Sequence, residues 1–337
     1  MTEPFVRPDV QALLAFLANA PSPKIHEVDA ATARTMMMTS RMLLDADPVA
    51  LPVIRDLSIP GPKGDIRARL YDARESREPG PVMVFFHGGG FVIGDLETHE
   101  PYCTRAAQML DLPVVAIDYA LAPEHPWPAA PDDCEAAARW VATSPSVLGR
   151  TVTSLVLSGD SAGGALTVIT TMSLRDRPAA VPVIAQFPIY PATDMTRAYP
   201  SNALFADGYM LTAASMAWFD GHYGAEADDV RTSPLLGNHE AMPPTLVLTA
   251  SLDPLRDQGR AYAAALIAAG VQTLYREAAG NIHGFINLAK GVPSSVGDIA
   301  GALAALAPVI AEAEANRVMA QASGAGIARD KGGARAA

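Results

Sequence analysis

Residues suited to nucleophilic catalysis occur in this chain, beginning with a serine in a glycine-rich turn. Ser161 lies within residues 159–164, Gly-Asp-Ser-Ala-Gly-Gly, between an apolar run and a helical stretch. In that setting a G-x-S-x-G pattern predicts a sharp strand-to-helix turn, where small neighbours avoid clashes and expose the hydroxyl. The following helix directs the positive end of its dipole at negative charge that forms beside the serine. We therefore predict that Ser161 is a nucleophile.

A serine hydroxyl reacts readily only when a base accepts its proton and an acid orients that base. His283 and Asp253 each follow a strand candidate, and the order serine, aspartate, histidine is that of α/β-hydrolases. Asp257 is a second candidate acid, because Asp253 could instead cap a helix that starts at Pro254. We favour Asp253, since Asp257 lies one helical turn further from the sheet edge.

A glycine run follows the third strand candidate, directly after His87. The tetrahedral intermediate of acyl transfer carries an oxyanion, which needs preorganised N–H donors, and glycine lets backbone amides approach closely. The predicted oxyanion hole uses amides of Gly88, Gly89, Gly90 and Ala162, with Gly89 and Gly90 favoured beside Ala162. A phosphate loop is a poor alternative, because the glycine spacing fits neither common pattern. We expect His87 to hydrogen-bond the loop rather than to exchange protons.

The elements that must position these residues alternate between strands and helices. The strand candidates are residues 52–59, 65–72, 81–86, 113–118, 154–158, 182–187, 244–249 and 271–277. The middle candidates are continuously apolar, as strands covered on both faces must be. The helix candidates between and after them are residues 98–110, 131–143, 162–175, 256–269 and 294–315. This alternation predicts an α/β fold with an eight-stranded, mostly parallel sheet flanked by helices.

Two segments that interrupt the alternation predict a helical cap. One holds two helices before any strand, and the other holds a loop and then a helix from Thr212 to Tyr223, with Thr212 as its N-cap. The expected division is 1–48 for the N-terminal cap segment, 49–189 and 234–315 for the two parts of the hydrolase core, 190–233 for the cap insert, and 316–337 for a flexible, solvated tail.

Composition favours a compact enzyme in a reducing compartment. Half of the 337 residues are hydrophobic, 18% are charged, and the net charge of −11 disfavours nucleic acid and anionic membrane surfaces as partners. We expect no apolar run to reach membrane-spanning length. Cys103 and Cys134 are too few for a disulfide framework, and neither has a second Cys or a His at the spacing of a metal site. The apolar stretch near the N-terminus follows acidic residues, whereas a signal peptide would begin with basic ones. We expect a cytoplasmic protein without a metal site.

The sequence resembles the bacterial hormone-sensitive-lipase-like (family IV) carboxylesterases of the α/β-hydrolase superfamily. The resemblance rests on His-Gly-Gly-Gly-Phe at 87–91, Asp-Tyr-Ala-Leu-Ala-Pro-Glu-His-Pro-Trp-Pro-Ala at 118–129, Gly-Asp-Ser-Ala-Gly-Gly at 159–164, Asp-Pro-Leu-Arg-Asp at 253–257 and His-Gly-Phe at 283–285. It implies a helical cap, short- to medium-chain acyl esters as substrates, no cofactor and often a homodimer. The aspartate before the nucleophile places the chain in the GDSAG branch.

The chain departs from the family pattern at two positions. Ala120 stands where the family usually has arginine, which predicts the loss of an ion pair near Glu124. Asn281 stands where a hydrophobic residue is usual and is expected to alter the alcohol-side pocket. The residues expected to line the substrate pocket are Phe91, Asp160, Met210, Ile282 and Phe285.

Other functions on the same fold differ in what they require of the triad. A non-catalytic binder would typically lose a triad member, and this chain keeps Ser161, Asp253 and His283. An epoxide hydrolase would carry aspartate at the nucleophile position. Amide and lactone hydrolysis stay open, because the same triad serves them. Hydrolysis of small carboxylic esters is therefore the predicted function.

Overall fold

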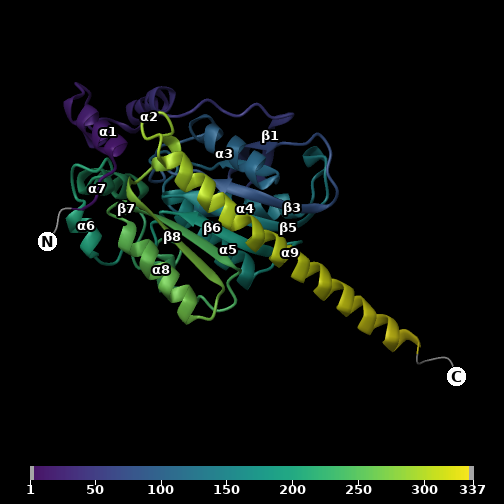
Figure 1. Ribbon diagram of the computed structural model, residues 1–337. Helices are drawn as coiled ribbons and strands as arrows, with labels where there is room; N and C mark the ends of the chain where they lie inside the picture. The colour runs from purple at the N-terminus through teal and green to yellow at the C-terminus, as the bar shows by residue number, and fades with distance from the viewer. Residues whose placement is uncertain (1–3, 334–337) are drawn as a thin grey trace.

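The computed structural model describes the backbone of residues 4–333 and the side chains as far as Ser323. At its centre is one eight-stranded sheet with the order β1-β2-β4-β3-β5-β6-β7-β8 (Figure 1). The strands are β1 Val53–Gly61, β2 Gly64–Asp72, β3 Gly80–Phe86, β4 Val114–Asp118, β5 Val152–Asp160, β6 Val183–Ile189, β7 Thr245–Leu252 and β8 Thr273–Ile282. Only the pairings of β2, with β1 and with β4, are antiparallel. The predicted mostly parallel sheet is confirmed.

Helices cover both faces of this sheet. They are α1 Pro8–Asn19, α2 Ala30–Leu44, α3 Leu96–Leu110, α4 Ala129–Ala142, α5 Ala162–Asp176, α6 Pro200–Leu204, α7 Ala213–Tyr223, α8 Arg256–Ala268 and α9 Ser295–Gly333. Helices α3 and α9 share one hydrophobic cluster with the sheet, whereas α4 and α5 share another on the opposite face. Helix α8 packs beside α5. The result is a three-layer α/β sandwich.

Strand β3 shows why the middle strands are continuously apolar. Val82, Val84 and Phe86 belong to the cluster under α4 and α5, while Met83 and Phe85 belong to the cluster under α3 and α9. All five side chains are fully buried. Because successive residues of a strand point to opposite faces, a strand between two helical layers needs apolar residues at every position.

The two helical segments outside the alternation lie at the end of the sheet where the parallel strands finish. Helices α1, α2, α6 and α7 gather there (Figure 1), and α7 contacts the short 3₁₀ turn Ile25–Glu27 of the N-terminal segment. Thr212 caps α7 as predicted, because its side chain accepts a hydrogen bond from the Ser215 amide at 3.1 Å. We refer to these two segments, residues 8–44 and 200–223, as the cap.

Helix α9 corrects the expected C-terminal boundary. We predicted a helix that ends at Ala315 and a flexible tail after it, but α9 continues to Gly333 and projects past the rest of the molecule (Figure 1). Alanine-rich sequence favours helix even without tertiary packing. Side chains from Val318 to Ser323 are exposed. The prediction of a solvated tail is therefore confirmed for these residues, but the prediction that they are not helical is wrong.

Part of α9 also corrects the expectation that no apolar segment reaches membrane-spanning length. Over Ser295–Ser323 it is long and apolar enough to cross a membrane, and it is the one such helix in the described residues. The first half of α9 packs in the hydrophobic core, where Ile299, Leu303 and Leu306 are buried against the sheet. A core helix meets the same length and composition criteria.

Candidate active site

Ser161 lies at the junction of β5 and α5 in a strained backbone conformation. Its φ and ψ are 55° and −117°, outside the regions that most residues adopt. A β-carbon at Gly163 would overlap the Phe86 carbonyl oxygen, and one at Gly159 would overlap backbone oxygens as well. The two glycines therefore permit the tight approach of this turn to β3. The predicted strand-to-helix turn, with small residues on both sides of the serine, is confirmed.

The structure brings together the three residues expected to do the chemistry. Ser161 Oγ lies 2.8 Å from His283 Nε2, and His283 Nδ1 lies 2.7 Å from Asp253 Oδ2. These side chains come from the ends of β5, β8 and β7, which meet at one edge of the sheet. Asp253 is fully buried and His283 is 8% exposed, so the hydrogen bonds lie largely out of water. This geometry allows a proton to pass from the serine to the histidine.

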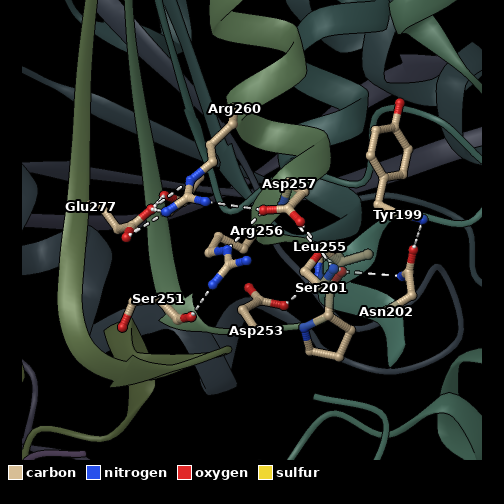
Figure 2. A network of polar contacts seen from close by, with 12 residues as sticks. Tyr199, Ser201, Asn202, Ser251, Asp253, Leu255, Arg256, Asp257, Arg260 and Glu277 are labelled. Atoms are coloured by element: carbon tan, nitrogen blue, oxygen red, sulfur yellow. Dashed lines mark hydrogen bonds and ion pairs between the residues drawn. The ribbon is translucent and has the colours of Figure 1, made fainter. Parts of the chain in front are cut away.

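Asp253 contacts the histidine, as favoured, and is not the N-cap of α8, because that helix starts at Arg256 with Leu255 at its N-cap. Its Oδ1 accepts the Leu255 amide at 2.7 Å at the start of α8, while its Oδ2 contacts the histidine. Figure 2 shows the first of these contacts, with the carboxylate on the loop that precedes the helix. The backbone bond fixes the carboxylate in the orientation that the histidine requires.

Asp257 points elsewhere. Its Oδ2 accepts the amide of Ser201 in α6 at 2.9 Å, and its Oδ1 accepts from Arg256 at 2.8 Å and Arg260 at 3.2 Å (Figure 2). Burial alone would raise the pKa of Asp257, but the neighbouring Arg256 and the Ser201 amide lower it. Asp257 thus ties the cap insert to α8 and makes no hydrogen bond with His283.

Free backbone amides lie in the glycine run and at the start of α5. In the described residues, the amides of Gly89, Gly90 and Ala162 donate to no protein acceptor. The Gly88 amide instead donates to Asp160 Oδ1 at 2.7 Å. Gly88 is therefore removed from the expected set of oxyanion donors, and the favoured trio of Gly89, Gly90 and Ala162 is left.

Asp160 holds the glycine run in place by accepting the Gly88 amide. Besides Gly88, it contacts His99 Nε2 at 3.2 Å and accepts from Tyr190 Oη at 3.3 Å. Burial raises the pKa of Asp160, but the nearby His99 ring and the Gly88 amide more than offset this, so the pKa is lowered. Asp160 is thus a buried carboxylate held in its charged form directly beside Ser161.

The role expected for His87 agrees with its surroundings. Its Nδ1 lies 2.8 Å from the Gly88 carbonyl oxygen, and its ring stacks on Tyr119 at 4.3 Å between centroids. Burial, and then the neighbouring His99, lowers the pKa of His87 to about 4. The ring is therefore neutral near pH 7 and holds the loop, as predicted.

Most of the expected pocket residues pack into the protein instead of lining a pocket. Asp160, Ile282 and Phe285 are 3% exposed or less, and Phe91 stacks on Tyr223 with 7% exposure. Side chains buried in this way offer no surface to a substrate in this conformation. A sequence pattern marks proximity along the chain, but burial depends on which elements pack over a residue.

Met210 is the exception, and other residues near the site were not among the predicted pocket residues. Met210 is 44% exposed and approaches Gly284 beside the histidine. The Phe219 ring of α7 lies directly against Gly90, where a β-carbon would overlap it. The Tyr190 ring lies 4.6 Å from the His283 ring. No local motif marks Phe219 or Tyr190, because each reaches the site only through tertiary packing.

The two departures from the family pattern have structural outcomes that differ from those expected. Glu124 keeps an ion pair, because Arg34 of α2 replaces the missing partner at 2.6 Å. Asn281 is fully buried, donates to Asp298 at 3.0 Å and accepts the Ile282 amide at 3.0 Å. It therefore shapes the backbone before the histidine and does not line a pocket.

Residues 4–323 contain no group of three or more His, Cys, Asp or Glu side chains arranged to hold a metal ion.

A family model described as the alpha/beta hydrolase fold matches residues 83–287, which span the glycine run, the serine and the histidine. More than half of the chain is covered by this match. The family assignment thus coincides with the region that holds the site.

Known proteins similar to this chain include several esterases. The carboxylic ester hydrolase LipN of Mycobacterium tuberculosis is 41% identical over 245 residues, which are 70% of this chain and 65% of LipN. Ethyl acetate hydrolase of Pseudomonas putida is 35% identical over 295 residues, 84% of this chain and 92% of that protein. The structure of an ester hydrolase from the metagenome of Lake Arreo, EH1AB1, complexed with a bipyridine phosphonate derivative, has a TM-score of 0.85 and 38% identity, and the match covers 90% of this chain and 98% of EH1AB1.

These similarities and the fold assign the chain to a class. The protein belongs to the α/β-hydrolase family, among the bacterial carboxylesterases that resemble hormone-sensitive lipase.

Proposed function

We propose that this protein is a serine esterase that hydrolyses short- to medium-chain carboxylic esters through an acyl-enzyme intermediate. The observation that carries the proposal is the continuous hydrogen-bonded series from Ser161 Oγ through His283 to Asp253, at 2.8 and 2.7 Å. Such a series lets one imidazole act in turn as base and acid.

In the proposed first half-reaction, Ser161 Oγ attacks the ester carbonyl carbon while His283 Nε2 takes the hydroxyl proton. The carbonyl oxygen becomes an oxyanion, which the amides of Gly89, Gly90 and Ala162 stabilise. The C–O bond to the alcohol then breaks, His283 returns the proton to the leaving alkoxide, and the acyl group stays on the serine. Asp253 holds the imidazole in the required tautomer and stabilises its positive charge.

In the second half-reaction, water replaces the alcohol. His283 takes a proton from the water, the hydroxide attacks the acyl carbon, and the carboxylic acid leaves as the proton returns to Ser161 Oγ. Apart from the ester and water, the groups that take part in these steps all belong to the chain.

Short acyl groups are proposed as substrates on two grounds. The Phe219 ring lies against Gly90 and Met210 approaches Gly284, so apolar cap side chains bound the space around the serine. The Pseudomonas putida relative is named for ethyl acetate, an ester of a two-carbon acid. Amides and lactones are alternative substrates that the same geometry could serve.

Two further proposals concern the setting of the protein. We infer a cytoplasmic location, supported by Cys103 and Cys134, which are both buried and unpaired. We also infer a homodimer, which the family resemblance implies; size-exclusion chromatography with light scattering would show twice the chain mass of 35.3 kDa if it is correct.

The direct test of function is a comparison of initial rates on p-nitrophenyl esters. The wild-type protein should hydrolyse p-nitrophenyl acetate and butyrate, and Ser161→Ala should lower kcat by about 10⁴- to 10⁶-fold. Its melting temperature should stay close to that of the wild type, since the hydroxyl serves chemistry more than packing. An active Ser161→Ala protein would exclude the proposed mechanism.

A further inference from the structure

One cap side chain, Arg34 of α2, reaches the oxyanion loop, which we define as residues 87–94. Its Nε donates to the Val92 carbonyl at 2.9 Å, and its Nη2 donates to the Ala122 carbonyl at 2.9 Å. Nη1 and Nη2 also donate to the Glu124 carboxylate at 2.8 and 2.6 Å. A single guanidinium therefore joins the cap to the loop and to the segment beside it.

The oxyanion loop is strained and needs restraint from outside. Gly89, Gly90 and Phe91 have φ values of 120°, 59° and 64°. For a residue with a β-carbon, such as Phe91, this conformation costs roughly 1–2 kcal/mol. Phe91 is held by stacking on Tyr223 and by the Ala122 amide, which donates to its carbonyl at 2.9 Å. Arginine binds the next carbonyl along the chain.

We propose that Arg34 is a positioning residue that keeps the oxyanion loop in the conformation that leaves its amides free. Val92 closes the turn, since its amide donates to the Gly89 carbonyl at 3.1 Å while its own carbonyl accepts from Arg34. Release of that carbonyl would let the turn relax and rotate the Gly89 and Gly90 amides. The inference rests on the proposed function, in which these amides bind the oxyanion.

Glu124 fixes the guanidinium that makes these bonds. The hydrogen bond from Arg34 lowers the pKa of Glu124 to about 2, so the pair stays charged at any pH suited to an ester assay. Position 120, in the neighbouring loop, is alanine in this chain, and the arginine that pairs with Glu124 comes from the cap. Order in the loop thereby depends on a docked cap.

Arg139 provides a matched control away from the site. Its Nε donates to Glu135 at 2.9 Å, and its two Nη atoms donate to the Arg177 and Pro178 carbonyls at 2.8 and 3.4 Å. Its side chain is 31% exposed, against 30% for Arg34. Each arginine therefore binds one carboxylate and two carbonyls, but only Arg34 touches the oxyanion loop.

The test compares Arg34→Met with Arg139→Met in the full chain, using p-nitrophenyl butyrate and melting temperature. We expect both variants to lose similar stability, and only Arg34→Met to lose kcat, by about 10- to 100-fold, with KM within about threefold of wild type. Loss of a whole oxyanion donor costs roughly 10²- to 10³-fold, so displaced donors should cost less. Equal kcat losses in the two variants, or a change confined to KM, would overturn the proposal.

A second variant covers the case in which Arg34→Met does not fold. Arg34→Lys keeps a charge for Glu124 but lacks the planar fork that reaches both carbonyls, so kcat should fall at least threefold. Unchanged kcat in Arg34→Lys would then overturn the positioning role. An inactive wild-type protein would overturn the proposed function together with this inference, whereas an active wild type with an unaffected Arg34 variant would overturn the inference alone.

Discussion

At the scale of single residues, two aspartates four positions apart do different work. Asp253 contacts the imidazole, whereas Asp257 binds Ser201 and two arginines. Without its carboxylate partner the imidazole takes the wrong tautomer, so Asp253→Asn should lower kcat by roughly 10³- to 10⁴-fold. Asp257→Asn should lower the melting temperature and cost about tenfold or less in kcat. Steady-state kinetics on both variants would reveal a wrong acid if the two effects were reversed.

A second prediction at the scale of single residues concerns Asp160. Asp160→Asn removes the charge that accepts the Gly88 amide and faces His99, and a buried charged hydrogen bond contributes about 1.5–3 kcal/mol. We expect a drop in unfolding free energy within that range, measured by urea denaturation, together with a fall in kcat as the glycine run loosens. A variant with wild-type stability and kcat would contradict the supporting role.

That the three residues of the proposed triad lie together could be predicted from the sequence, because each stands beside a strand end. Ser161, Asp253 and His283 follow β5, β7 and β8, and parallel strands place their carboxyl ends at one edge. Pocket residues could not be predicted in this way. Ile282 and Phe285 also lie at the carboxyl end of β8, but their side chains are buried and face no pocket. Arg34 and Glu124 lie 90 residues apart, so no local pattern connects them.

At the scale of elements, strand types were predictable and some boundaries were not. Strand β8 was expected over 271–277 but runs over Thr273–Ile282. Its last part includes Ala278, Ala279 and Gly280, residues of low strand propensity. Pairing with β7 extends the strand to Ile282 and so delivers His283 to the site. Tertiary pairing thus overrides local propensity next to the chemistry.

The attachment of α9 to β5 yields a prediction about stability alone. Glu314 accepts hydrogen bonds from Thr153 and Ser154 at 2.7 Å each and pairs with Arg317. These contacts lie at the start of β5, and Ser161 follows its far end, roughly 25 Å away at about 3.3 Å per residue. Glu314→Gln should therefore lower the unfolding free energy by about 1 kcal/mol and leave kcat unchanged.

The pH dependence of this contribution has a defined sign. Burial tends to raise the pKa of Glu314, but Arg317 and the two hydroxyls lower it to about 2, from an ordinary 4.5. A carboxyl with a lowered pKa stabilises the fold above its unfolded pKa, and the effect is lost as pH falls from about 4.5 to 2. The stability difference between wild type and Glu314→Gln should shrink over that range in thermal melts. A difference that grows as pH falls would contradict the assignment.

At the scale of the whole molecule, the proposed function predicts that the cap over the strand ends limits substrate size. Phe219 and Met210 come from the cap insert and approach the two loops that flank Ser161. Each accommodated CH₂ gains about 0.8 kcal/mol until the available space ends. We expect the highest kcat/KM on acyl chains of roughly two to eight carbons, with a steep fall beyond. Interfacial activation on emulsified long-chain triglyceride would contradict this expectation.

The central claim is that Ser161 is the nucleophile of an ester hydrolase, and one measurement tests it directly. The native protein is treated with a p-nitrophenyl phosphonate ester, digested, and mapped by mass spectrometry. A single phosphonyl adduct should form on the peptide that contains Ser161, in step with the loss of esterase activity, and Ser161→Ala should take up none. Labelling of a different residue, or full inactivation without an adduct on Ser161, would contradict the account.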